Sequence, residues 1–296
     1  MTTPLPDIRT ILVATDLSPA SDMAVEQAAW LAARRGAELL LLHVFNDGLW
    51  ASVKAIYAAE RWAGVEPAIV SRDRLSQQAS AIAAQHGIRV RCETRSGSAA
   101  REIAAFGREQ GAGLLVLGEH GEDWIGDAVL GGTALKVLKR ADLPVLLVRR
   151  PFPSACSSIL VATDFSDNAQ RAAQLSLHLF PEARQQLVHA YFVAFEGRMR
   201  LAGAASDEIE RYRDDEAARA MRRIEEQRAA LGTAVAVDAL VKRGSPAGVL
   251  IDEAAQQHAD LIVIGKHGGT VFDERLMGSV TQNVLYHADC NVLLVP

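Results

Sequence analysis

The chain repeats itself along its length. The segment ILVATDLS at 11–18 returns as ILVATDFS at 159–166, and GLLVLGEHG at 113–121 returns as DLIVIGKHG at 260–268. Matched positions stay 146 to 148 residues apart. A repeat of this period predicts two similar domains in tandem, each large enough to enclose its own hydrophobic core.

Each half alternates short apolar runs with amphipathic or alanine-rich stretches. Strands that alternate with helices predict an α/β fold built from βαβ units, with right-handed crossovers and a parallel sheet covered on both faces. We therefore expect two doubly wound domains, each with a five-stranded parallel sheet and four helices. The proline-containing segment 149–157 separates them, so the expected domains are 1–150 and 156–296.

Composition argues against several classes of protein. The net charge of −5 gives no electrostatic footprint for nucleic acid. No apolar run approaches the roughly 20 residues of a membrane span, and the first residues lack the pattern of a secretory signal. Cys92, Cys156 and Cys290 form no CxxC pair and are typical of thiols in a reducing compartment. We expect a cytoplasmic protein.

The residues that suggest a binding site fall at the ends of predicted strands. Asp16 and Asp164 end the first strand of each half, and Gly118 and Gly265 end the fourth. In doubly wound sheets, ligands bind in the crevice at the carboxyl ends of the strands, where the winding reverses. The sequence therefore predicts a site at this edge in each half.

The stretch GKHGGTVFDERLMGSV at 265–280 carries the most specific pattern, three glycines followed by Ser279 before a helix. Glycines let the backbone approach an anion closely, and a helix N-terminus suits phosphate. Ser279 could cap that helix or bond a phosphate oxygen, while Asp164 could accept from an exocyclic amine or a ribose hydroxyl. Positive charge near the phosphates is expected from Lys266, His267 and Arg275.

Each of these features also has a purely structural explanation. Glycines after a strand are often turn residues, a serine is often just a helix cap, and an aspartate often caps a turn. The recurrence of the whole combination in both halves favours a binding site. His120 and His267 are interpreted as loop residues and His43 and His189 as interior ones, so no metal site is predicted.

The glycine spacing resembles the nucleotide motif of the universal stress protein family, G-x2-G-x9-G followed by serine or threonine. The second half carries it complete, and ATDFS at 162–166 matches the family's first-strand signature. The resemblance covers nearly the whole chain, twice, as in the E-type two-domain members. It implies the strand order 3-2-1-4-5 in each half. The implied ligand is ATP or another adenine nucleotide, with or without magnesium.

The resemblance also implies a role for each residue. The motif aspartate contacts adenine, an apolar residue of the second strand packs by the base, and the glycines and serine hold ribose and phosphates. The preferred site, in the second domain, then consists of Ala162, Thr163, Asp164, Ala190, Ile264, Gly265, His267, Gly268, Gly278, Ser279, Val280 and Thr281. The corresponding first-domain positions are Ala14, Asp16, Val44, Gly118, Gly121, Gly131 and Gly132.

The first half departs from the family pattern. Gly132 stands where the family has a hydroxyl, and Thr133 comes one position later. Its loop carries the carboxylates Glu122, Asp123 and Asp127, which would repel a triphosphate. In the second half, Asp273 and Glu274 are offset by Lys266 and Arg275. The sequence therefore predicts the better nucleotide site in the second domain.

The sequence offers little for catalysis. It contains no GxxxxGK[ST] phosphate loop, no GxSxG elbow and no nucleophile–base pair on one element. The leading interpretation is a non-enzymatic, nucleotide-binding stress regulator that acts on an unknown protein partner. A nucleotide-independent scaffold or lipid- or small-ligand-binding stress protein and a weak ATPase stay open.

The resemblance implies one further contact, pairing through the fifth strands. Here that pairing would make the two halves an internal pseudo-dimer and leave a homo-oligomer possible. The charged run 208–228 is interpreted as a solvated helix face, with a partner surface as the alternative.

Overall fold

The computed structural model describes most of the chain: residues 7–45, 67–121, 130–152, 156–193, 196–232, 236–268 and 277–296. The chain divides into two compact units between residues 151 and 152. Each unit is an α/β domain with a parallel sheet, so the predicted fold class is confirmed.

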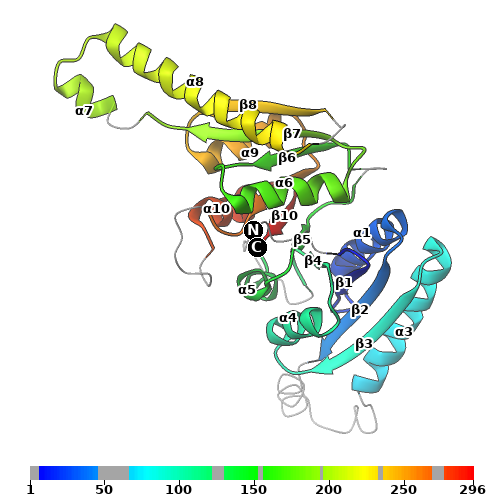
Figure 1. Ribbon diagram of the computed structural model, residues 1–296. Helices are drawn as coiled ribbons and strands as arrows, with labels where there is room; N and C mark the ends of the chain where they lie inside the picture. Colours follow the sequence, from blue (N-terminus) through cyan, green and yellow to red (C-terminus); the bar gives the residue numbers. More distant parts are fainter. Residues whose placement is uncertain are drawn as a thin grey trace, which may run out of the picture. The chain divides into compact units, whose positions relative to one another are not determined.

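The first unit holds its strands in the order β3-β2-β1-β4-β5, and every neighbouring pair is parallel. The strands are β1 (Thr10–Ala14), β2 (Glu38–Phe45), β3 (Val90–Ser96), β4 (Leu114–Gly118) and β5 (Val145–Val148). Helices α1 and α3 pack against each other, as do α4 and α5, so each pair covers one face of the sheet (Figure 1). The helices are α1 (Pro19–Arg35), α3 (Pro67–His86), α4 (Ala99–Glu109) and α5 (Gly132–Arg140).

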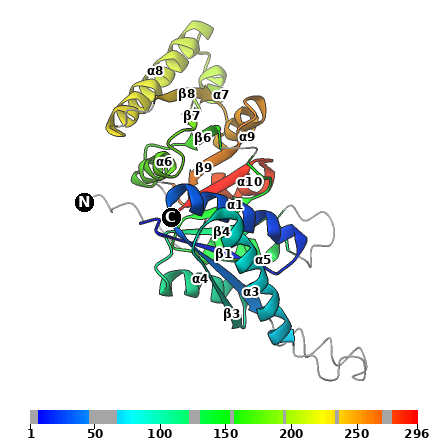
Figure 2. The ribbon, with the colours of Figure 1, turned by 90° about the vertical axis from the view of Figure 1, so that its right-hand side faces the viewer.

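The second unit has the same winding, with its strands in the order β8-β7-β6-β9-β10, all parallel. The strands are β6 (Ser158–Ala162), β7 (Arg184–Tyr191), β8 (Val237–Arg243), β9 (Leu261–Gly265) and β10 (Asn291–Val295). Helix α8 covers β7 and β8, and α9 packs against α10 (Figure 2). The helices are α6 (Asp167–Leu179), α7 (Glu196–Leu201), α8 (Ser206–Ala230), α9 (Pro246–Gln256) and α10 (Ser279–His287).

The central strands are buried on both faces, which is why their sequences are continuous apolar runs without alternation. Ile11, Leu12 and Val13 of β1 have no exposed surface, and β9 and β10 are buried along almost their whole length. At roughly 25 cal/mol per Å² of buried apolar surface, these strands supply much of the driving force for folding.

Capping residues fix both ends of α1. Ser18 is the N-cap and accepts from the backbone N–H of Ser21, with Pro19 in the first turn. Gly36 ends the helix in the left-handed conformation, at φ 63°. The helix therefore begins where the strand delivers the chain, at the carboxyl edge of the sheet.

Two findings complete the fold. Helix α7 is a short additional helix of the second unit that the repeat did not predict. Among the described residues, no helix has both the length and the apolar composition needed to cross a membrane.

Candidate functional site

A pocket of about 230 Å³ opens at the carboxyl ends of β6, β7 and β9, beside the N-termini of α9 and α10. All of the residues predicted for the second-domain site line it: Ala162, Thr163, Asp164, Ala190, Ile264, Gly265, His267, Gly268, Gly278, Ser279, Val280 and Thr281. The structure therefore brings together residues that lie more than a hundred positions apart in the sequence.

The turn after β6 presents Asp164 to the pocket. Phe165 takes a left-handed conformation, φ 67°, which costs a bulky residue about 1–2 kcal/mol. Two hydrogen bonds hold the turn: the Phe165 N–H donates to Thr163 Oγ1 at 3.0 Å, and the Ser166 N–H donates to Asp164 Oδ1 at 3.0 Å. Leu17 repeats this conformation in the first domain, at φ 65°. The same turn therefore positions the aspartate in both domains.

The glycine loop closes over this turn. A Cβ added at Gly268 would lie 2.9 Å from Asp164 Oδ2, so only glycine permits this approach. The Gly278 N–H donates to the carbonyl of Lys266 at 3.1 Å, and the Thr281 hydroxyl donates to the carbonyl of Gly265 at 2.9 Å. These bonds fix the start of α10 next to the end of β9.

The sequence left the role of Ser279 open between a helix cap and a phosphate ligand. The structure excludes the cap, because Gly278 is the N-cap and Ser279 is the first residue of α10. The Ser279 side chain is exposed and lines the pocket. Its hydroxyl and the N-terminus of α10 therefore face the same space.

Charge near the phosphate end differs from the prediction. Lys266, the residue directly after β9, is buried and does not line the pocket. His267 does line it. The loop residues Asp273, Glu274 and Arg275 of the second domain and Glu122, Asp123 and Asp127 of the first lie outside the described residues.

His189 lines the pocket on its β7 side. Its Nδ1–H donates to the carbonyl of Thr163 at 2.8 Å, and its ring lies 4.2 Å from that of Phe165 between centroids. The guanidinium of Arg223 lies 4.2 Å from the Phe165 ring, so the stack runs from α8 to the pocket. His43 makes the matching bond in the first domain, to the carbonyl of Thr15 at 2.9 Å.

The ionisation of His189 leads to a pH-dependent prediction. Burial lowers the pKa of His189 below its ordinary value, and the charge of Arg223 acts in the same direction. Below pH ~6.5 the unfolded chain therefore binds a proton at His189 more readily than the folded protein does. The stability from His189 is complete above pH ~6.5 and is lost as the pH falls through the folded pKa. In urea titrations we expect the free energy of unfolding to fall less on acidification in His189→Gln than in the wild type. An equal loss in the two proteins would contradict this prediction.

The first domain builds the same scaffold with a tighter fit. Ala14, Val44 and Gly118 occupy the predicted ends of β1, β2 and β4. Asp16 is half-buried where Asp164 is exposed, and a Cβ added at Gly121 would lie only 2.4 Å from Asp16 Oδ2. Asp16 therefore lies closer to its glycine loop than Asp164 does.

The phosphate end of the first-domain scaffold carries fewer hydroxyl groups. Gly131 is the N-cap of α5, and its N–H donates to the carbonyl of Glu119 as Gly278 does to Lys266. Gly132 follows where the second domain has Ser279, and Ala134 stands where it has Thr281. The loop closure is conserved between the halves while both hydroxyls are lost.

Comparison with known proteins agrees with this architecture. The model of the universal stress protein family matches residues 7–149 and 157–296. The chain belongs to the universal stress protein family. It is 29% identical to a universal stress protein of Mycolicibacterium smegmatis, over 96% of both chains, so this is a tandem universal stress protein. Membership supports a role in the stress response.

Other members of the family resemble one domain or the whole chain. The Bacillus subtilis universal stress protein YxiE is 30% identical over 47% of this chain and 97% of its own length. A crystal structure of a universal stress protein from Archaeoglobus fulgidus superposes with a TM-score of 0.65 at 18% identity, covering 97% of this chain and 98% of that one. That likeness establishes the shared fold.

The sequence pattern missed part of the pocket wall: Ser166, Ala169, Val188, His189, Pro246 and Leu250. Ser166 and Ala169 belong to the first turn of α6, directly after the predicted aspartate, and proximity in the chain could have identified them. Pro246 and Leu250 lie on α9, beyond β8. Ser245-Pro246 is a helix-start signal at the carboxyl edge of the sheet, which would have placed this helix end near the site.

Proposed function

We propose that the second domain binds an adenine nucleotide, with ATP as the principal ligand. The observation that carries this proposal is the convergence of every residue of the predicted second-domain site on one pocket. Asp164, exposed at one side, offers a carboxylate to the amine of a base or to a ribose hydroxyl. The apolar residues Ala162, Val188, Ala190 and Ile264 give the pocket a surface on which a flat ring could pack.

The opposite side of the pocket suits phosphates. Helix α10 begins there, and its first N–H groups carry the partial positive charge of the helix dipole. The Ser279 hydroxyl adds a donor, and Gly268 and Gly278 allow close approach of the backbone. No lysine or arginine is among the described residues that line this pocket, so backbone N–H groups and the Ser279 hydroxyl would have to bind the phosphates.

Three differences support a preference for the second domain over the first. Asp164 is exposed to the pocket whereas Asp16 is half-buried. The Ser18 hydroxyl also donates to Asp16 Oδ1, which occupies part of that carboxylate's capacity. Ser279 has a hydroxyl where Gly132 has none. A nucleotide would therefore find more hydrogen-bond partners in the second domain.

Magnesium would arrive with the nucleotide rather than bind first. The described residues contain no group of three or more histidine, cysteine or carboxylate side chains arranged for a metal. Asp164 is the single carboxylate among the described residues that line the pocket. A divalent ion would then be held mainly by phosphate oxygens, as magnesium is in many nucleotide sites. We propose that the bound nucleotide changes the conformation that this protein presents to a partner, and that nucleotide hydrolysis is not its function.

The decisive experiment combines Gly278→Ala with Ser279→Ala and measures ATP affinity by calorimetry. A Cβ at Gly278 meets no atom closer than 3.8 Å, so the fold tolerates the change. We expect ATP to bind roughly tenfold more weakly, because a hydrogen bond to a charged phosphate contributes about 1.5–3 kcal/mol. Gly132→Ala, which meets nothing within 4 Å in the first domain, should leave the affinity unchanged.

Two outcomes would defeat the proposal. One is wild-type protein that binds no adenine nucleotide at micromolar concentration. The other is a double variant that binds ATP as tightly as the wild type does. A loss of affinity in Gly132→Ala instead would move the site to the first domain.

A further inference from the structure

The segment that joins β7 to α8 carries an unusual helix. None of the 6 residues of α7 is buried, and Figure 1 shows α7 beside the N-terminal end of α8. Phe192 and Leu201 are 72% and 90% exposed, the highest values among the large hydrophobic residues that the structure describes. Burial of apolar surface therefore does not hold α7 in place.

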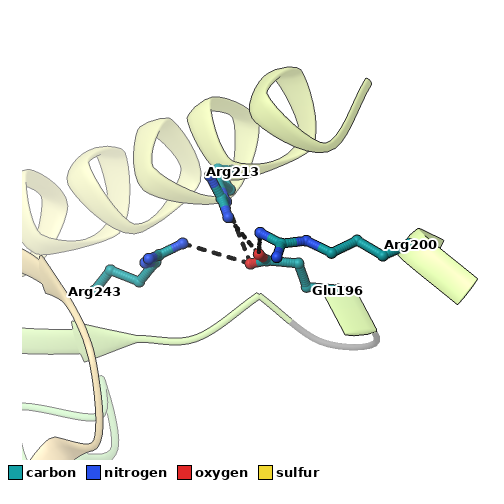
Figure 3. Close-up of polar contacts among 4 residues, drawn as sticks. All are labelled: Glu196, Arg200, Arg213 and Arg243. Carbon is teal, nitrogen blue, oxygen red and sulfur yellow. Dashed lines mark hydrogen bonds and ion pairs between the residues drawn. The ribbon is translucent and has the colours of Figure 1, made fainter. Parts of the chain in front are cut away.

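Ionic contacts hold it instead (Figure 3). Glu196 of α7 forms a two-pronged pair with Arg213 of α8, whose Nε and Nη2 donate to the two carboxylate oxygens. Arg200 donates to Glu196 Oε1 at 2.8 Å, and Arg243, at the end of β8, donates to Oε2 at 3.4 Å. The bond from Arg213 lowers the pKa of Glu196, so this carboxylate is ionised at neutral pH.

In this cluster the positive charge of the arginines exceeds the negative charge of the carboxylate that they contact. Arg213 alone matches Glu196 in charge and in geometry, since a guanidinium and a carboxylate form a complete fork. Arg200 and Arg243 are therefore in excess, and their side chains are 62% and 50% exposed. Glu210 also acts on Arg213, which still leaves an excess of one positive charge.

Each excess arginine has an exposed hydrophobic neighbour. Leu201 directly follows Arg200. Phe192 directly follows Tyr191, which pairs with Arg243 in the register of β7 and β8. The two guanidiniums reach the Glu196 carboxylate from different sides in Figure 3. We call Phe192, Arg200, Leu201 and Arg243 the α7 surface.

We propose that the α7 surface docks an acidic segment of a partner protein, with carboxylates on Arg200 and Arg243 and an apolar side chain on Leu201 or Phe192. Charge complementarity of this kind raises the association rate and selects the partner. An exposed apolar anchor supplies the affinity that a surface ion pair alone does not. This docking does not depend on the nucleotide site.

A membrane with anionic lipids has related chemistry, but it suits the molecule less well. The chain has a net charge of −5, and an extended anionic surface would repel it as a whole. A short acidic segment interacts only with charges within the Debye length, about 8–10 Å at physiological salt. The local excess at α7 therefore favours a peptide over a lipid surface.

The test uses the full chain and a panel of short fluorescein-labelled peptides, read by fluorescence anisotropy. The peptides combine several glutamates or aspartates with a leucine or phenylalanine at different spacings. We expect at least one to bind, and its affinity to fall roughly tenfold in the double variant Arg200→Gln, Arg243→Gln. This variant keeps the Arg213–Glu196 pair that holds α7. Added salt should weaken binding, and glutamine-for-glutamate versions of the peptide should not bind.

Arg219→Gln is the matched control, because Arg219 on α8 is also 62% exposed and pairs with Glu216. It should leave peptide binding unchanged, while Phe192→Ser with Leu201→Ser should abolish it. The proposal is overturned if no peptide of the panel binds, or if Arg219→Gln weakens binding as much as the double variant. Binding to phosphatidylserine vesicles without binding to peptides would also overturn it.

Discussion

Gly268→Ala is expected to weaken ATP binding roughly tenfold to a hundredfold while the protein keeps its thermal stability. The added Cβ would lie 2.9 Å from Asp164 Oδ2, closer than two such atoms can approach. The carboxylate is the end of an exposed side chain, so it can rotate away at little cost to the fold. The rotation removes the acceptor that we assign to the base or ribose.

Calorimetry with ATP and a thermal melt together test this prediction. Gly121→Ala is the matched change in the first domain, where the added Cβ would lie 2.4 Å from Asp16 Oδ2. It should leave ATP affinity unchanged if the second domain binds the nucleotide. Full affinity in Gly268→Ala would show that Asp164 does not contact the ligand, and a large drop in melting temperature would show that the glycine serves the fold.

Gln227→Ile is expected to lower ATP affinity several-fold, and Ala169→Ser in the same chain is expected to restore it. The hydroxyl of Thr163 donates to Gln227 Oε1 at 2.6 Å, in a buried position. The first domain solves the same problem differently, since Thr15 Oγ1 bonds the hydroxyl of Ser21 at 2.9 Å. Both threonines accept the N–H that shapes the aspartate turn.

The two domains provide the threonine hydroxyl with different hydrogen-bond partners, Ser21 in the first and Gln227 in the second. Ala169 occupies the position of Ser21, three residues after the N-cap serine. Gln227 occupies the position of Ile82, because α3 and α8 bury residues at the same spacing: Leu75, Ala79 and Ile82 against Ala220, Ile224 and Gln227. Removing Gln227 alone leaves the Thr163 hydroxyl without its acceptor, and the turn that carries Asp164 loosens.

Stability should behave differently from affinity in this series. No described group hydrogen-bonds the buried Nε2 of Gln227, and isoleucine removes that cost, about 1–3 kcal/mol. The double variant should therefore be at least as stable as the wild type in urea titrations. Ala169→Ser alone should bind ATP normally. The four proteins compared are the wild type, the two single variants and the double variant. If ATP affinity simply follows stability across them, Gln227 contributes to packing and does not position the turn of Asp164.

The succession of strands and helices along the chain could be predicted because the signals that define it are local, whereas the strand order within each sheet was implied by the family resemblance. Continuous apolar runs predicted buried parallel strands, and Ser18, Pro19 and Gly36, which stand at the ends of α1, are residue types that favour helix ends. The glycine spacing likewise placed Gly268 and Gly278 against one pocket. Each of these features depends on neighbouring residues in the chain, where periodicity and capping rules apply.

The remaining features depend on contacts between distant segments. The sequence predicted Lys266 as a cation near the phosphates, but in the folded domain Lys266 is buried and does not line the pocket. The link from Thr163 to Gln227 spans 64 positions and cannot be read from either local segment. Helix α7 has no buried face and hence no apolar period, so only the convergence of arginines on Glu196 explains its position.

The left-handed turn at Leu17 and Phe165 has a consequence for how such a chain can diversify. Its geometry is held by backbone N–H groups that donate to the side chains of Thr15 and Asp16 in one domain and of Thr163 and Asp164 in the other. Neither copy needs a bound nucleotide to keep its shape. After a duplication, the ligand preference of one half can thus change while that half still folds.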